Sequence, residues 1–463
     1  MASITFDRFD LGIDHRKGAA VSDANRLREM KNAYVTTGMA TAKRPGLKQV
    51  ATLAAGTRGL FAAFGKLHTF SSGTAAHNDA LFVNHAVPLS SNAAAAVRDV
   101  HFADVFNGFV YAAIEYDGGV VQHHYLDGAA QTHIADNKCP HTKACIKMAS
   151  KIFAVGSGDA DVVRYCSTSK PRDWSTANDA GFLPTGLNMR GDRSANALGA
   201  YQNKLVVFSR DGSQVWAVDP DPTAMRLADV VENVGTQHPR TVATVGGDLY
   251  FMSDYGFRSI TTLADTENLA DVDIGSPIDA LVRKETASSI RPKAFYFYGT
   301  GQYLCAIGNQ IFVYSVSRSS KIAAWSRYFL PREVDAFAEL NMKLYMRCGD
   351  DVFVLDEEST TDAGLQFEVL IDLPYMDFKS RGKLKHIYAV DVVSEGACQF
   401  SIGFDQRDAD AFTPPFVVEG NSQPGDMLPV DCIGTEFSLR FRNYDASPFR
   451  LDSVTVYYNT MEG

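Results

Sequence analysis

Six histidines and cysteines lie close together between positions 123 and 145, and both residue types bind transition metals. Structural zinc sites generally use four ligands, with paired cysteines two to four residues apart. Here five residues separate the two cysteines, and no second pair follows. The spacing therefore favours a loop ahead of a strand, and we predict no metal ligand among them. The residues are His123, His124, His133, Cys139, His141 and Cys145.

Two aspartate-rich turns, 156–161 and 405–410, carry carboxylates of the kind that bind calcium. Neither follows the EF-hand spacing, and aspartate is common in turns because it hydrogen-bonds its own backbone. The sequence also lacks a phosphate-binding P-loop and a nucleophile elbow. We expect solvated turns, with no cofactor.

The segment 209–216, Ser-Arg-Asp-Gly-Ser-Gln-Val-Trp, is similar to the aspartate box of sialidase propellers. It lacks one residue between Asp211 and Gly212 and has no threonine before Trp216. That box is a structural turn, and the arginine triad and Tyr–Glu pair of sialidases are not identifiable here. We therefore predict no catalytic residues and no enzyme activity.

The same region, 203–219, has the pattern of a β-hairpin, since two apolar runs flank an Asp-Gly turn. Weaker copies recur at intervals of 41 to 54 residues. A period of roughly 40 to 50 residues in an all-β pattern is typical of a β-propeller with one four-stranded blade per repeat. The alternative is a β-sandwich with evenly spaced hairpins. The copies begin at positions 66, 108, 151, 204, 248, 302 and 343.

These patterns predict an all-β fold with a β-propeller of about seven blades, six to eight being compatible with the repeats. We expect an N-terminal extended docking segment over 1–50, the propeller over 51–358 and a C-terminal antiparallel β-sandwich or barrel over 359–463. Within these units, residues 22–30 are expected to form a helical turn capped by Ser22, and residues 261–293 a short helix. The C-terminal strands are expected at 365–373, 384–393, 399–404, 436–441 and 451–457.

The chain has 463 residues and a formal net charge of −10, which argues against a general polyanion-binding surface. The N-terminus lacks a signal-peptide pattern, and no apolar run is long enough for a membrane span. Seven dispersed cysteines indicate reduced, buried thiols. These features predict a protein made in a cytosol.

The N-terminal segment resembles tail nozzle or tail hub proteins of short-tailed bacteriophages, also called packaged-DNA stabilisation proteins. In that family a strand-like opening leads to a threonine-glycine, an arginine-proline-glycine and then a propeller. The segment 373–392 resembles the family as well, with an Asp-Phe pair, a basic cluster and a strand. The matching N-terminal residues are Asn32, Tyr34, Val35, Thr36, Thr37, Gly38, Arg44, Pro45 and Gly46.

The resemblance implies a structural virion protein, assembled in the host cytoplasm. Copies, expected to number six, would form a ring below the portal and adaptor, with tail fibres or tip proteins as further partners. The ring would continue the DNA channel and retain packaged DNA without sequence-specific binding.

Two other classes stay open: a glycan-binding or glycan-cleaving propeller, and a propeller scaffold in a host complex. Basic residues in the N-terminal segment either dock on an acidic partner or DNA or form an ordinary solvated face. They are Arg26, Arg28, Lys31, Lys43, Arg44 and Lys48.

Overall fold

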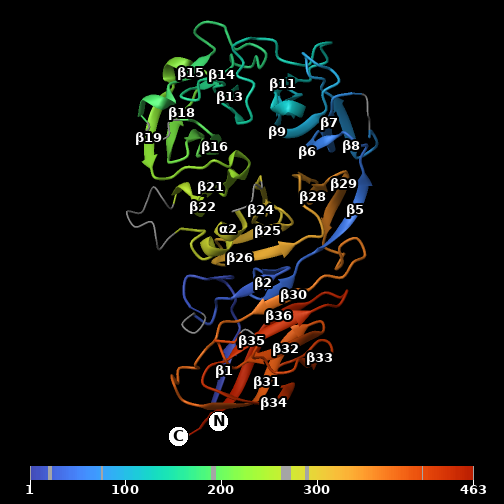
Figure 1. Cartoon of the computed structure of the whole chain (residues 1–463), viewed down its shortest axis with the longest axis vertical. Helices are drawn as coiled ribbons and strands as arrows, with labels where there is room; N and C mark the ends of the chain where they lie inside the picture. Colours follow the sequence, from blue (N-terminus) through green and yellow to red (C-terminus); the bar gives the residue numbers. More distant parts are fainter. Residues whose placement is uncertain are drawn as a thin grey trace.

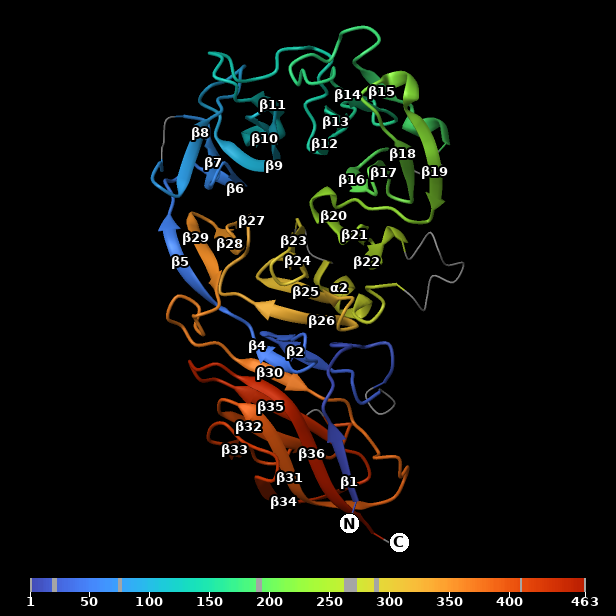
Figure 2. The same ribbon diagram turned by 180° about the vertical axis from the view of Figure 1, so that it is seen from behind.

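Strands make up most of the regular structure in the computed structural model, which describes residues 2–18, 23–73, 77–188, 194–261, 273–286, 291–408 and 410–461. Many small sheets form one end of an elongated molecule, and two larger sheets lie at the other (Figure 1). The two termini lie together at the end farthest from the small sheets (Figure 2). The predicted all-β class is therefore confirmed.

Each copy of the sequence repeat supplies the second strand of a different three- or four-stranded unit, which we call a small sheet, so the periodicity marks real units of the fold. The first three sheets contain β6 (Arg58–Ala63), β7 (Lys66–Ser71) and β8 (Phe82–Ala86); β9 (Val97–Phe106), β10 (Phe109–Tyr116) and β11 (Val121–Tyr125); and β12 (Cys145–Met148), β13 (Lys151–Val155), β14 (Val163–Tyr165) and β15 (Gly181–Leu183).

The next sheets contain the predicted hairpin, whose strands β17 and β18 pair with Val206 opposite Val215. They are β16 (Ala197–Tyr201), β17 (Lys204–Phe208), β18 (Gly212–Ala217) and β19 (Arg226–Glu232); β20 (Ala243–Val245), β21 (Asp248–Ser253) and β22 (Gly256–Ser259); and β23 (Lys293–Phe297), β24 (Gln302–Ile307), β25 (Gln310–Ser317) and β26 (Ile322–Phe329).

The seventh small sheet combines strands from distant parts of the chain. Its members are β27 (Ala336–Leu340), β28 (Lys343–Cys348), β29 (Asp351–Asp356) and β5 (Gly46–Thr52). The predicted boundary at residue 50 therefore falls inside a strand that pairs with β29. The first strand of each small sheet contacts the first strand of the next, and β27 contacts β6 of the first sheet.

Short helical segments connect these strands. Among the described residues they are η1 (Asp117–Gly119), η2 (Thr185–Asn188), η3 (Pro222–Ala224), η4 (Pro239–Thr241) and α2 (Asp279–Thr286). The short helix predicted within 261–293 is thus confirmed as α2. The helical turn predicted at 22–30 is wrong in its described part, because residues 24–25 form a turn, Leu27 forms a β-bridge with Ile13, and β2 begins at Glu29. Its proposed cap, Ser22, lies outside the described residues.

At the other end, strands of the N-terminal segment join those of the C-terminal region. One sheet contains β1 (Ala2–Phe6), β3 (Ala33–Val35), β4 (Thr41–Lys43), β36 (Arg450–Thr460), β31 (Lys385–Glu395) and β34 (Met427–Gly434). The other contains β2 (Glu29–Lys31), β30 (Val369–Asp372), β35 (Ser438–Asn443), β32 (Cys398–Gly403) and β33 (Phe416–Val418). All five strands predicted beyond residue 365 are present.

Strand β2 joins the two ends of the molecule. It pairs in parallel with β26 of the sixth small sheet and antiparallel with β30, so one nine-stranded sheet runs across the junction. The apolar core crosses it too: Phe257 and Trp325 belong to the same buried cluster as Phe441. Because burial of such side chains is the main favourable contribution to folding, the two ends stabilise each other.

Arg44 lies at this junction with no exposed side-chain surface. Its Nη1 and Nη2 donate to the two carboxylate oxygens of Asp362 at 2.8 and 2.6 Å, and its Nε donates to Asn32 Oδ1 at 3.1 Å. Asn32 in turn donates to the carbonyl oxygen of Glu368 at 2.8 Å. Next to Arg44, Gly46 lies so close to the chain that an added Cβ would be 2.2 Å from the carbonyl oxygen of Thr361.

The buried Arg44–Asp362 pair generates a stability prediction. Arg44→Ala leaves an uncompensated buried carboxylate, so we expect the free energy of unfolding to fall by about 3–5 kcal/mol. Urea denaturation followed by fluorescence measures this change. Arg407→Ala removes an exposed arginine paired with Asp405 and serves as the matched control, with an unchanged midpoint expected. Equal stability of the two variants would contradict the assigned role of Arg44.

Candidate functional site

Charged side chains from five of the small sheets converge near their first strands. Strands β9 and β10 supply one group, and segments beside β12, β20, β23 and β27 supply the others. We call this set the inner-strand cluster. Its members are Arg98, Asp99, His101, Glu115, Lys143, Arg240, Arg291, Lys293 and Asp335.

Glu115 is the buried carboxylate of the cluster, with a side chain that is 1% exposed. Its oxygens lie 2.6 Å from His101 Nε2, 3.0 Å from Lys143 Nζ and 3.3 Å from Arg291 Nη1. Burial alone would raise the pKa of Glu115, but hydrogen bonds from Lys143 and His101, together with the charge of Lys143, lower it to about 2. Glu115 is therefore ionised at neutral pH.

The same surroundings hold His101 in its neutral form, whereas they hold Glu115 in its charged form. Burial lowers its pKa despite the nearby carboxylates of Asp99 and Glu115, which raise it. A neutral imidazole at neutral pH follows, and it donates its Nε2–H to Glu115. The pair is thus a hydrogen bond between a carboxylate and a neutral ring.

Asp99 is the second carboxylate of the cluster. Arg240 Nη1 lies 2.9 and 2.8 Å from its two oxygens. Burial raises the pKa of Asp99, but the charges of Arg240 and Lys293 and the hydrogen bonds from Arg240 outweigh burial and lower it. Like Glu115, Asp99 is ionised at neutral pH. Neither carboxyl therefore resembles a general acid, whose pKa must be raised.

Two cavities, of about 400 and 330 Å³, adjoin the inner-strand cluster. The first is lined by His101, Lys143, Arg240 and Arg291, and the second by Arg58, Arg98, Lys293 and Arg347. These seven arginines and lysines share four carboxylates, those of Asp99, Glu115, Asp335 and Asp350, which gives this region a net excess of three positive charges. In a chain of net charge −10, this local excess suits a small anion.

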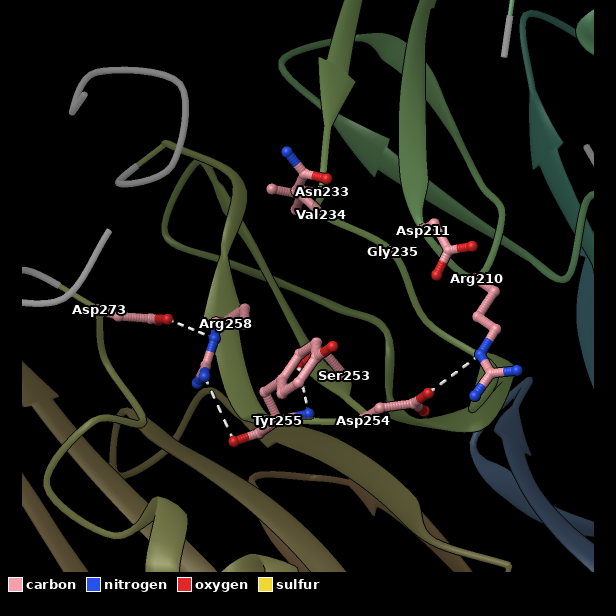
Figure 3. A pocket seen from close by; sticks show the side chains of 10 residues that line it. All are labelled: Arg210, Asp211, Asn233, Val234, Gly235, Ser253, Asp254, Tyr255, Arg258 and Asp273. Atoms are coloured by element: carbon pink, nitrogen blue, oxygen red, sulfur yellow. Dashed lines mark hydrogen bonds and ion pairs between the residues drawn. The ribbon is translucent and has the colours of Figure 1, made fainter. Parts of the chain in front are cut away.

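A third cavity, of about 490 Å³, lies between the β17–β18 turn, the segment after β19 and the β21–β22 hairpin (Figure 3). Its charges are paired: Arg210 Nε lies 3.2 Å from Asp254 Oδ2, and Arg258 contacts Asp273. Burial raises the pKa of Asp273 to about 6, although Arg258 lowers it. The Oδ1 atom of Asp273 has no hydrogen-bond partner among the described residues. At neutral pH the ionised Asp273 carboxylate therefore lowers the free energy of unfolding.

The structure brings together three of the six histidines and cysteines singled out in the sequence. Donor atoms of His123, Cys139 and His141 all lie within 4.8 Å of one another. His124 instead hydrogen-bonds Tyr116 and Thr132, and His133 lies beside Gln131. Spacing along the chain could not reveal this group, because His123 comes from β11 and the other two from the loop before β12.

The other sequence motifs have local structural roles. Trp216 Nε1 donates to Gln214 Oε1 at 2.9 Å, and Ser209 Oγ accepts from the Gly212 amide at 3.0 Å, so the 209–216 segment is a turn and a strand. In the 405–410 turn, Asp405 pairs with Arg407 at 3.0 Å. The inner-strand cluster had no sequence signal, because its members are scattered from position 98 to position 335.

No family model matches the sequence, and the search of curated proteins gave no match. Solved structures with similar folds are distant. An exo-β-1,3-galactanase from Phanerochaete chrysosporium is 10% identical, with 77% of this chain and 95% of that chain covered and a TM-score of 0.31. BamB from Moraxella catarrhalis is 12% identical, with coverage of 76% and 96% and a TM-score of 0.38.

PorZ, a surface component of the type-IX secretion system of Porphyromonas gingivalis, is also 12% identical, with 83% of this chain and 46% of that chain covered and a TM-score of 0.37. These values are too low to support an argument about function. Among the described residues, no helix is both long enough and apolar enough to cross a membrane.

The buried Glu115 generates a pH-dependent prediction. Glu115→Gln should lower the free energy of unfolding by about 2–3 kcal/mol at pH 7, because the carboxylate is favoured in the folded state. A carboxyl with a lowered pKa stabilises the protein above about pH 4.3 and loses this effect as the pH falls toward 2. The difference between variant and wild type should therefore shrink over that range in denaturant titrations. The exposed Glu419→Gln is the control, and a pH-independent deficit would contradict the prediction.

Asp273 generates a prediction of opposite sign. Its folded pKa of about 6 lies above the unfolded value near 3.9, so the folded state binds more protons between these values. The free energy of unfolding of the wild type should fall by an amount on the order of 3 kcal/mol as the pH rises from 4 to 6. In Asp273→Asn this fall should be absent. Melting temperatures across this range measure it. Asp211→Asn changes an exposed residue of the same cavity and should keep the wild-type profile.

Proposed function

We propose that the seven small sheets are the blades of a closed β-propeller, and that the chain is a structural subunit of a tailed-phage particle, a tail nozzle or hub protein. The cyclic contacts among the first strands support closure, because they return from β27 to β6. The pairing of β5 with β29 supports it as well, since it joins the beginning and the end of the repeat region in one sheet.

The observation that carries the functional proposal is the position of the residues that resemble the phage family. Asn32, Arg44 and Gly46 lie buried where the N-terminal segment joins both ends of the molecule. A motif of this kind fixes the propeller to the C-terminal β-domain through hydrogen bonds, a shared sheet and a shared core. Such a junction suits a subunit that transmits force in a particle.

The proposed assembly is a ring, with six copies as its expected number. Edge strands β33 and β34 of the C-terminal domain expose Val417, Met427 and Ile433, which an adjacent copy would cover. Head-to-tail contacts between unlike surfaces generate rings of this kind. The ring would lie below the portal and adaptor, contact fibres or tip proteins and continue the DNA channel. Its acidic character would let DNA pass without strong binding.

The second candidate is a glycan-binding or glycan-cleaving propeller. The observation in its favour is the pair of carboxylates, Asp99 and Glu115, beside the two inner cavities. Because both pKa values are lowered, this arrangement favours binding over acid-catalysed cleavage. The absence of enzyme activity remains our prediction.

Ring formation separates the two candidates. We expect mass photometry and negative-stain microscopy to show a ring or tube, either with the purified protein or after addition of a portal–adaptor complex. The double variant Met427→Asp, Ile433→Asp should abolish the ring because it places charges in the proposed contact. Asp211→Asn, an exposed change in the turn before β18 and outside that contact, is the matched control.

A wild-type protein that stays monomeric and does not join the portal–adaptor complex would overturn the virion proposal. Glycan-array binding would then test the second candidate. A ring that forms equally well with the double variant would leave the ring in place but contradict the assigned contact.

A further inference from the structure

We propose that His123, Cys139 and His141 form a buried zinc site between the second and third small sheets, with the Tyr111 hydroxyl as the adjacent oxygen donor. This inference is independent of the proposed function. It rests on the geometry of the donor atoms, on the hydrogen bonds that orient the two rings and on the charge that the pocket can accept.

The donor distances fit one metal ion. Cys139 Sγ lies 3.5 Å from His123 Nδ1 and 3.8 Å from His141 Nδ1. Zinc binds sulfur at about 2.3 Å and imidazole nitrogen at about 2.0–2.1 Å, so a tetrahedral angle places two such ligands about 3.5 Å apart. The Tyr111 oxygen lies 2.8 Å from His123 Nδ1, which makes it the adjacent candidate for the fourth donor.

Hydrogen bonds fix the nitrogen that each ring presents. His123 Nε2 lies 2.8 Å from the carbonyl oxygen of Thr142, to which it donates, and this leaves Nδ1 as an acceptor beside the Tyr111 hydroxyl and Cys139 Sγ. The His141 ring hydrogen-bonds the backbone of Ile134, while its Nδ1 accepts from the His123 amide at 3.1 Å. A metal-binding histidine typically donates its other N–H to a carbonyl in this way.

The backbone also holds the loop in an uncommon conformation. His141 has a φ of 48°, in the left-handed region that non-glycine residues seldom adopt. Such strain persists where the surrounding structure imposes it and is concentrated at functional sites. The His141 ring lies beside both Cys139 and His123.

The surroundings suit a neutral complex. His123 is fully buried, Cys139 is 5% exposed, and Tyr111, Ile152 and Trp174 belong to the same apolar cluster as Cys139. Zinc with one thiolate, one phenolate and two neutral imidazoles carries no net charge. Binding releases the Cys139 and Tyr111 protons to solvent, and the metal replaces the hydrogen bonds that His123 Nδ1 and His141 Nδ1 accept in its absence.

Cobalt(II) is the probe, because it occupies zinc sites and its thiolate complexes absorb in the near ultraviolet. We expect the full-length protein to bind one equivalent and to show a charge-transfer band that zinc abolishes. Cys139→Ser should lose the band, and His141→Gln should weaken cobalt binding at least tenfold. Cys166→Ser, which removes another buried thiol of the same cluster, is the matched control and should keep the band.

A wild-type protein that binds no cobalt, or a band that Cys166→Ser removes as fully as Cys139→Ser does, would overturn the proposal. Should Cys139→Ser fail to fold, X-ray absorption at the zinc edge of the wild-type protein decides the matter. One sulfur neighbour at about 2.3 Å with nitrogen or oxygen neighbours near 2.0 Å would support the site. A shell of oxygen and nitrogen alone would refute it.

Discussion

A buried guanidinium must have every donor satisfied, and the junction of this molecule is built around that requirement. Arg44 reaches Asp362, Asn32 and two backbone carbonyls, those of Pro45 and Phe329. Those partners come from the N-terminal segment, from the end of β26 and from the chain beyond β29. The interaction therefore aligns three chain segments at once, and the placement of β2 between β26 and β30 depends on the same alignment.

The electrostatics of the small sheets follow a similar rule. Wherever a carboxylate is buried near the first strands, arginine or lysine approaches within hydrogen-bonding distance, as at Asp99 and Glu115. The pKa values of both carboxyls fall because this pairing outweighs burial. At Asp273 burial outweighs the pairing, and the pKa rises. The balance of the two effects, more than the residue type, decides which carboxyl is ionised at neutral pH.

Local features were predictable from the sequence, and long-range ones were not. The hairpin of β17 and β18 follows from alternating residues around Asp211-Gly212, and all seven repeat copies mark second strands of sheets. In contrast, β2 and β5 pair with strands roughly 300 residues away, and no local pattern encodes such partners. The prediction of a helical turn at 22–30 is wrong for the same reason. Leu27 and Met30 pair with residues outside this segment and belong to the shared core.

In the candidate sites, too, local features were predictable from the sequence and long-range contacts were not. His141 and Cys139 are neighbours in the sequence, but His123 joins them only through the pairing of β10 and β11 and the path of the following loop. The inner-strand cluster gathers residues from five sheets, so its members become a group only after folding. Sequence patterns thus identified the repeating framework, while the sites depend on how its units are placed against one another.

The pairing of β5 with β29 and of β1 with β36 has a consequence for synthesis. On the ribosome, β5 emerges about 300 residues before its partner, and β1 emerges about 450 residues before β36. Both strands stay unpaired while the intervening sheets form, and contacts of such sequence separation slow the final folding step. Exposed strand edges in this interval are templates for association with other chains. Efficient production of the protein therefore depends on how these early strands are protected until their partner strands have been made.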